Sequence, residues 1–144
     1  MCWIGKNACR IARRDITVYK IGCIYKNIFT SLYQNYVYKI GKVNKDIVLI
    51  PDIRYNMNGV FRIEDPLCAI YRGYHSYTSI SMPYSDLRIF SRTIYLGKLS
   101  QTMWLKNNFY IATFIIPEGS NYFENDHGEI VSSNIIYTGK YVKL

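Results

Sequence analysis

The sequence contains little of what marks several common classes of protein. Alanine is scarce, and long stretches of strong helix formers are missing, which argues against a largely helical protein. No window approaches about 18 uninterrupted apolar residues, the length that a membrane-spanning helix needs. The opening MCWIGKNACRIARR has no apolar core of the kind found in a secretory signal. We therefore expect a protein that stays inside the cell and does not cross a membrane.

Metal-binding and acyl-transfer patterns are also missing. The four cysteines stand at positions 2, 9, 23 and 68 and form no C-x-x-C pair, while His75 and His127 lie far from any zinc-ligand spacing. No order of serine, histidine and acid suits acyl transfer. We expect no metal site, no cofactor, and reduced cysteines that pack as small hydrophobic residues.

One cysteine allows a second interpretation. A small side chain at position 2 usually permits removal of Met1, which would leave Cys2 with a free α-amine. Such a thiol can be activated by its own amine, as in N-terminal nucleophile enzymes. Cys2 is therefore a candidate nucleophile, and the alternative is an ordinary thiol packed beside Trp3.

Residues that favour strands are abundant. The chain has 15 Tyr and is 49% apolar, and Tyr, Ile, Val, Thr and Phe dominate its apolar runs. The clearest run is 109–116, which ends at Pro117 and is better explained as a buried strand than as a helix. After a turn and the short run 121–123, a polar bend at 125–128 leads into a second β-rich run at 129–137. We expect this strand, turn and strand to seed the sheet.

The remaining runs predict a sheet that the rest of the chain completes. Residues 1–15 show spacing compatible with one short amphipathic turn or helix, and residues 85–90 with a short helix capped by Ser85. Gly22 is a candidate β-bulge. The further expected strands are 16–25, 36–43, 47–50, 60–63 and 67–71. The predicted fold is α+β, dominated by antiparallel strands, in a single compact domain of residues 1–144.

Charge is high and unevenly placed. The net charge is +8, and residues 1–60 hold ten Lys or Arg against three Asp, whereas residues 61–144 hold eight against seven acids. A basic half suits a polyanionic partner such as nucleic acid, a nucleotide or an acidic protein surface. Because the charges are scattered along the chain, plain solubility is the alternative.

The stretch 72–81 carries the chemistry most suited to a ligand. Its imidazole, hydroxyl groups and aromatic rings, with Lys20 and an arginine as cations, suit a nucleotide or another phosphate-bearing ligand. The alternative is that alternating Tyr and His on a strand fill half of a core. The candidate ligand-binding residues are Lys20, Arg72, Tyr74, His75, Tyr77, Thr78, Ser79 and Glu129.

Two resemblances bear on function. The opening MC, followed by ITVYKIG, YVYKIGK, RGYHSY and IIPEGSNYFENDHGEIVS, resembles a family of small uncharacterised proteins of gut Bacteroidetes and their phages. That resemblance implies the cytoplasm of a bacterial host cell or a virion as the location, and it supplies no activity.

The second, weaker resemblance is to the ADP-ribosyltransferase fold. VYK at 18–20, YTSIS at 77–81 and IIPEGS at 115–120 are similar to three strand motifs of that superfamily. Lys20 stands where the family has arginine, and Glu129 alone lies near the expected pair of glutamates. The resemblance implies a nucleotide-binding fold in which transferase activity is in doubt.

Together these observations favour a non-catalytic binding protein of phage or Bacteroidetes type, which recognises an anionic or nucleotide-like ligand or a macromolecular partner. The first alternative is a diverged ADP-ribosyltransferase-like enzyme. The second is a structural or assembly component of a virion.

Overall fold

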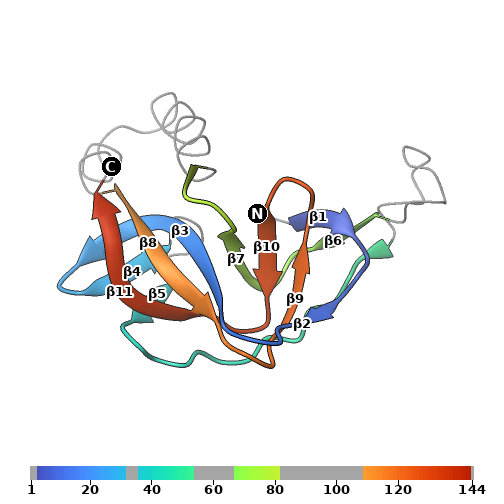
Figure 1. Ribbon diagram of the computed structural model, residues 1–144, viewed down its shortest axis with the longest axis horizontal. Coiled ribbons are helices and arrows are strands. Elements are labelled where there is room, and N and C mark those ends of the chain that lie inside the picture. Colours follow the sequence, from blue (N-terminus) through green and yellow to red (C-terminus); the bar gives the residue numbers. More distant parts are fainter. Residues whose placement is uncertain (1–2, 32–35, 54–66, 82–108, 144) are drawn as a thin grey trace.

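The computed structural model describes residues 3–31, 36–53, 67–81 and 109–143, and almost all regular structure in these ranges is antiparallel β-strand (Figure 1). The strands are β1 (Trp3–Lys6), β2 (Arg10–Ile11), β3 (Ile16–Tyr25), β4 (Ile28–Ser31), β5 (Val37–Lys39), β6 (Leu67–Ile70), β7 (Tyr74–Tyr77), β8 (Phe109–Ile116), β9 (Asn121–Glu124), β10 (Glu129–Ser132) and β11 (Ile136–Lys143). The chain therefore forms a β-rich domain, as the abundance of β-branched and aromatic residues predicts.

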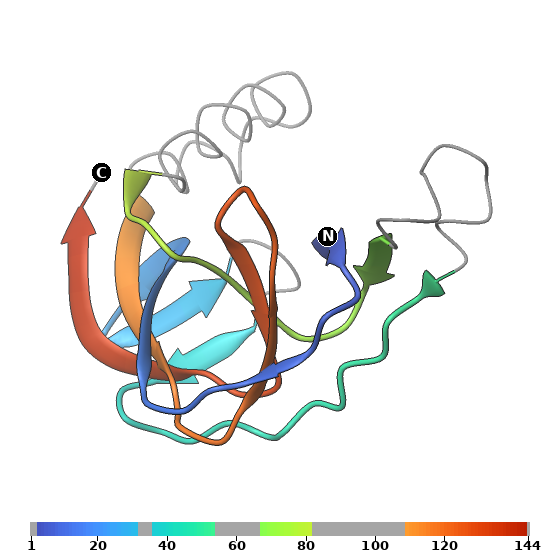
Figure 2. The same ribbon diagram turned by 45° about the vertical axis from the view of Figure 1, so that its right-hand side comes forward.

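The first half of the molecule is built around β3. One edge of β3 pairs with β8 along residues 16–23, and its other edge pairs near the C-terminal end with β4, which pairs in turn with β5. β11 pairs with the far side of β8. β5 then returns to β11, because Ile40 bridges to Tyr137 and the Gly41 N–H donates to the Tyr137 carbonyl at 2.8 Å. The strands β3, β8, β11, β5 and β4 thus close a small barrel, seen in the left half of Figure 2.

Four aromatic rings fill this barrel, one each from β4, β5, β8 and β11. Phe29, Tyr38, Phe114 and Tyr137 are all exposed by 2% or less. The Phe114 ring centre lies 5.0 Å from that of Phe29, 5.1 Å from that of Tyr38 and 5.2 Å from that of Tyr137. The first two contacts are edge-to-face, a geometry that stabilises aromatic pairs beyond simple burial of area.

Gly22 on β3 makes room for the Phe29 ring. It pairs in regular register with Tyr110 and Ser31, so the expected bulge at this position is wrong. A Cβ atom at Gly22 would lie 2.3 Å from the Thr30 carbonyl oxygen and 2.4 Å from the Phe29 ring. The glycine is therefore explained by close packing inside a continuous strand.

The second half of the molecule continues the same sheet. Tyr19 of β3 pairs with Tyr77 of β7, and the sheet extends from β7 through β10 and β9 to β2. A separate antiparallel pair, β1 with β6, covers it. There Trp3 is fully buried, packs on Phe123 with ring centres 5.6 Å apart, and donates its indole N–H to the Glu129 carbonyl at 2.8 Å.

Residues 41–52, here termed the connecting segment, join the two halves (Figure 1). The Ile47 N–H donates to the Ser133 carbonyl at 2.9 Å, and Asp52 exchanges two backbone hydrogen bonds with Ala69 of β6, at 2.8 and 3.1 Å. The strand expected at 47–50 is wrong, because no neighbouring strand takes up its backbone groups in a ladder. The expected strand 36–43 shortens to β5 for the same reason.

Some of the remaining expectations are confirmed by the structure, and others are wrong. Strands 16–25 and 109–116 are confirmed at their predicted bounds, and 67–71 is confirmed to within one residue. The turn or helix expected within 1–15 is wrong, since those residues form β1 and β2, held by long-range pairing. The run 129–137 divides into β10 and β11 at Ser133–Ile135. The expected helix at 85–90 and strand at 60–63 lie outside the described residues.

Truncating the central ring tests the barrel. Phe114→Ala should lower the free energy of unfolding by about 3–5 kcal/mol, because it removes the ring that contacts the other three and leaves a cavity. Urea denaturation measures this change. Val142→Ala, at a position that is 49% exposed on β11, is the control and should cost little. Equal effects of the two changes would contradict the aromatic core.

Candidate functional site

The structure brings together two of the residues that the sequence marks for ligand binding, Lys20 and His75. Lys20 lies on β3 with 8% of its surface exposed, and its ammonium group donates to the backbone carbonyl of His75. The ammonium nitrogen also lies 5.7 Å from the centre of the Tyr38 ring, within the range of a cation–π contact. Lys20 therefore belongs to the barrel interior, and its cation is already engaged by the protein.

Burial changes the titration of both residues. It lowers the pKa of Lys20 from 10.5 to about 8, because the charged form loses its hydration. Burial also lowers the pKa of His75 from 6.5 to about 4, and the Lys20 charge adds to this effect. His75 is thus neutral near pH 7, and its Nε2 atom is buried without a hydrogen-bond partner in the part of the chain that the structure describes.

Tyr74 lies on the core side of β7. It is 3% exposed, and its hydroxyl donates to the Lys45 carbonyl at 2.6 Å. Its ring packs against Tyr36 and Tyr38, with centres 5.8 and 6.2 Å away, and Tyr36 is the most exposed of the three. These contacts tie the connecting segment to β7, so Tyr74 has a structural task besides any contact with a ligand.

The other marked residues do not gather around Lys20. Arg72 is exposed before β7 begins, whereas Thr78 and Ser79 lie beyond the other end of β7. The Thr78 N–H and hydroxyl both donate to the Gly128 carbonyl, at 2.9 and 3.2 Å. Glu129 pairs with Tyr77 and so shares the face of the sheet opposite to that of Lys20. Cys2 lies outside the described residues.

A concentration of exposed lysines covers the other side of the barrel. Lys26 lies in the β3–β4 hairpin, Lys39 on β5, Lys42 just after it, and Lys140 and Lys143 on β11, and all five are exposed. We call these five residues the lysine face. None of them forms an ion pair with another described residue, and β4, β5 and β11 contain no acid.

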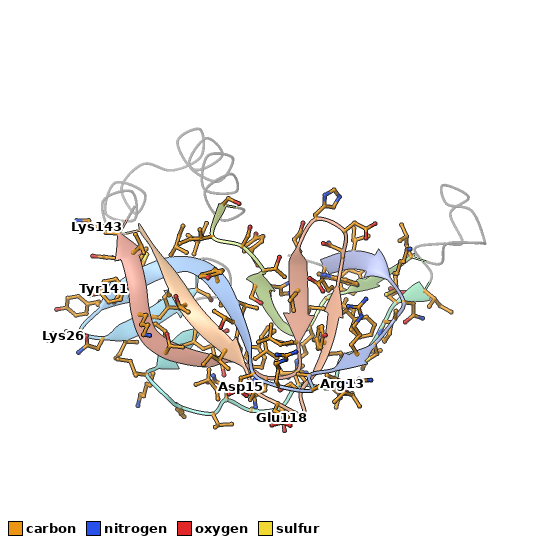
Figure 3. All side chains as sticks on the ribbon, in the orientation of Figure 1. Arg13, Asp15, Lys26, Glu118, Tyr141 and Lys143 are labelled. Carbon is orange, nitrogen blue, oxygen red and sulfur yellow. The ribbon has the colours of Figure 1, made fainter. Side chains whose placement is uncertain are left out.

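Exposed aromatic and apolar side chains accompany these lysines. Tyr25 is 64% exposed under the Lys26 ammonium, which lies 5.3 Å from its ring centre, and Tyr141 is 48% exposed between the two lysines of β11. Figure 3 places Lys26, Tyr141 and Lys143 at one end of the molecule, and Arg13 with its neighbouring acids along another side. Exposed rings beside unpaired cations suit a nucleic acid, whose bases stack while its phosphates are neutralised.

Sequence reasoning missed this surface because it weighed the charges one half of the chain at a time. The signal that could have found it is the spacing of acids. Residues 16–45 and residues 130–144 contain no Asp or Glu, and these two runs supply all the lysines of the surface. The parallel bridge between Ile40, which follows β5, and Tyr137 of β11 brings the two runs side by side.

Metal-binding clusters and membrane-spanning helices are both missing from the described residues. In the ranges that the structure describes, no three His, Cys, Asp or Glu side chains lie close enough to hold a metal ion. No helix within those same ranges has the length and hydropathy needed to cross a membrane. Cys9, Cys23 and Cys68 are free thiols, and burial raises the pKa of Cys23 and of Cys68.

Comparisons of the chain with models of protein families, with curated proteins and with solved structures find no match.

The two depressed pKa values predict how stability depends on pH. From pH 4 to 6.5 for His75, and from pH 8 upward for Lys20, the unfolded chain binds more protons at that residue than the folded chain, so each residue's contribution to the free energy of unfolding should rise with pH. From about pH 8.5 upward the buried thiols of Cys23 and Cys68, whose pKa values are raised, contribute in the opposite direction. The slope for each group should approach about 1.4 kcal/mol per pH unit. Above about pH 10 ionisation of buried tyrosines, whose pKa values are raised, opposes this rise.

Urea denaturation at a series of pH values measures these slopes. Lys20→Met should lower the slope between pH 8 and 10 relative to that of the unmodified protein, whereas Lys26→Met, at an exposed position, should leave the slope unchanged. Equal slopes of the unmodified protein and of Lys20→Met between pH 8 and 10 would show that Lys20 is hydrated in solution.

Proposed function

We propose that the protein is a non-catalytic binding protein that holds single-stranded nucleic acid on its lysine face. The observation that carries this proposal is the set of five exposed lysines, without a described ion-pair partner, on the strands that close the barrel and in the segments next to them. Phosphate neutralisation by such lysines supplies affinity without sequence selectivity. The exposed rings of Tyr25 and Tyr141 add stacking platforms for bases.

A single strand fits this surface better than a duplex does. Base stacking requires unpaired bases, and the surface offers two exposed rings, that of Tyr25 beside the Lys26 ammonium and that of Tyr141, whose ring centre lies 5.2 Å from that of Tyr110. No described helix is available to enter a major groove, which is the commonest way to read duplex sequence. A phage or Bacteroidetes source and a location in the bacterial cytoplasm or in a virion remain part of this proposal.

The nucleotide site expected at residues 72–81 has less support as a primary site. Its strongest members are engaged in the protein itself, since Lys20 donates to a backbone carbonyl and Tyr74 to another. Arg72 is the exposed cation of the set, so it is a useful comparison residue for the experiment below.

The alternative of an ADP-ribosyltransferase-like α+β enzyme also has less support. It would require the cation at position 20 and a glutamate to face one cleft. Lys20 points into the barrel, whereas Glu129 pairs with Tyr77 on the opposite face of the sheet.

Matched pairs of substitutions test the proposal. Lys39→Gln with Lys140→Gln should weaken binding of a dT oligonucleotide of about twelve nucleotides, and the slope of log affinity against log salt should fall by about 0.7 for each phosphate that the variant no longer neutralises. Fluorescence anisotropy between about 50 and 200 mM salt measures both. Arg13→Gln with Arg14→Gln removes the same charge elsewhere and is the control, and Arg72→Ala tests the 72–81 site. Equal weakening by the two double variants would show that binding depends on the net charge of the protein and not on the lysine face.

Aromatic substitutions test stacking separately. Tyr141→Ala should weaken the same complex by about 5- to 150-fold, the equivalent of about 1–3 kcal/mol for one stacked base. Tyr71→Ala is the matched control, because Tyr71 is 59% exposed and lies outside the lysine face. If both tyrosine variants bind as the unmodified protein does, bases do not stack on Tyr141 and the ligand is another polyanion.

A further inference from the structure

A groove of about 540 Å³ lies on a part of the molecule that the lysine face does not reach. One wall is residues 46–49 of the connecting segment, and the other is the turn 117–121 between β8 and β9. Its floor includes Ser133 and Asn134, where the chain passes from β10 to β11. This volume falls in the range of sites that hold small or short extended ligands.

The wall formed by the connecting segment has free backbone hydrogen-bonding groups. The backbone groups of Val48, Leu49 and Ile50 make no hydrogen bond with other described residues, while the chain is anchored on either side of them at Ile47 and Asp52. Exposure alternates along the segment, because Leu49 is half-buried whereas Val48 and Ile50 are 78% and 72% exposed. This alternation is typical of an extended strand that lacks a partner on one edge.

The charges of the groove are opposite in sign to that of the chain as a whole. Asp46 and Glu118 are the charged side chains in its lining, in a chain of net charge +8. The Asn134 amide holds one carboxylate oxygen of Asp46 at 2.8 Å and the Asn44 carbonyl at 2.8 Å, which fixes the position of the acid. Nucleic acid is therefore disfavoured in this groove, and a cationic side chain is favoured.

We propose that the groove binds an extended peptide segment of a partner protein, which adds as a strand along residues 48–50 and places a lysine or arginine side chain between Asp46 and Glu118. Main-chain hydrogen bonds to the free edge supply affinity, and the two carboxylates supply selectivity for the basic side chain. This site is independent of the nucleic-acid proposal, because the two surfaces share no residue.

A second copy of the chain is a poorer occupant of the same edge. Antiparallel pairing of two copies about Leu49 would place Asp46 of each copy opposite Asp52 of the other. Like charges directly opposite each other destabilise a strand pair. A partner with a basic residue at that position avoids this repulsion.

The test uses a defined probe, the capped heptapeptide Thr-Val-Thr-Lys-Thr-Val-Thr, titrated into the labelled full chain and followed by heteronuclear NMR. The amide signals of residues 48–50, Asn121 and Ser133 should shift in a saturable way. A peptide with glutamate in place of lysine should bind more weakly. A third peptide, N-methylated at alternate residues, cannot form the strand ladder and should not bind.

Variants of the protein sharpen the result. Asp46→Asn with Glu118→Gln keeps the shape of the groove and should weaken the lysine peptide by about 2- to 30-fold. Val48→Pro removes one backbone donor and should weaken all peptides, while the dispersion of the NMR spectrum reports whether the variant is folded. Asp126→Asn, which removes a charge from the exposed turn between β9 and β10, should leave binding unchanged.

Two outcomes would overturn the proposal. Equal binding of the lysine, glutamate and N-methylated peptides, or no saturable shift at residues 48–50, would show that neither the edge nor the carboxylates recognise a strand. A concentration-dependent dimer that Val48→Pro disperses, seen by analytical ultracentrifugation without peptide, would identify a second copy as the occupant.

Discussion

Contact among four aromatic rings is the constraint on which the barrel depends. Phe29 and Tyr38 come from the neighbouring strands β4 and β5, Phe114 and Tyr137 come from β8 and β11, and the return of the chain after β5 to β11 helps to bring the two groups of rings together. Because successive side chains of a strand point to opposite faces, the same closure turns Lys39 outward beside Tyr38. The arrangement of strands that packs Tyr38 inside the barrel therefore also places Lys39 on its outer surface.

Lys20 stands apart in this interior, since it alone among the described residues is both charged and buried. Among the described residues, Tyr19 and Tyr77 are the one residue pair that links β3 and β7, so these strands share little of a hydrogen-bonded ladder. The Lys20 ammonium lies at this junction and donates to the His75 carbonyl. An apolar residue there would leave that carbonyl without this donor. The lysine therefore joins the barrel to the second half of the sheet at the electrostatic cost that its lowered pKa records.

The sequence predicts those elements whose bounds depend on local residue pattern, and not those that depend on pairing with distant strands. The bounds of β3 and β8 follow from local pattern, because each is a continuous run of strand-forming residues that ends at a turn signal. β1 and β2 could not be predicted, since they are held by pairing with β6 and β9 and their own residues show no clear alternation. The surroundings of the candidate site residues were harder to predict than the strands. The sequence marks Lys20 and His75 as candidate ligand-binding residues, but whether a lysine on a strand faces solvent or the core is decided by partners that the sequence does not name.

The connecting segment has a mechanical role that its lack of regular structure conceals. It is tied to the barrel at Gly41, to the second half of the sheet at Ile47 and to the β1–β6 pair at Asp52, so it works as a strap across all three. Between the last two ties the backbone amides exchange hydrogen bonds with no other described residue, which is where native proteins open first. Ile47 packs against one hydrophobic cluster and Leu49 against the other, so release of this strap would uncover both, while β10, with Ile130 in one cluster and Val131 in the other, holds them together. Loss of native structure in this protein should accordingly begin with detachment of the strap from a sheet that is still whole.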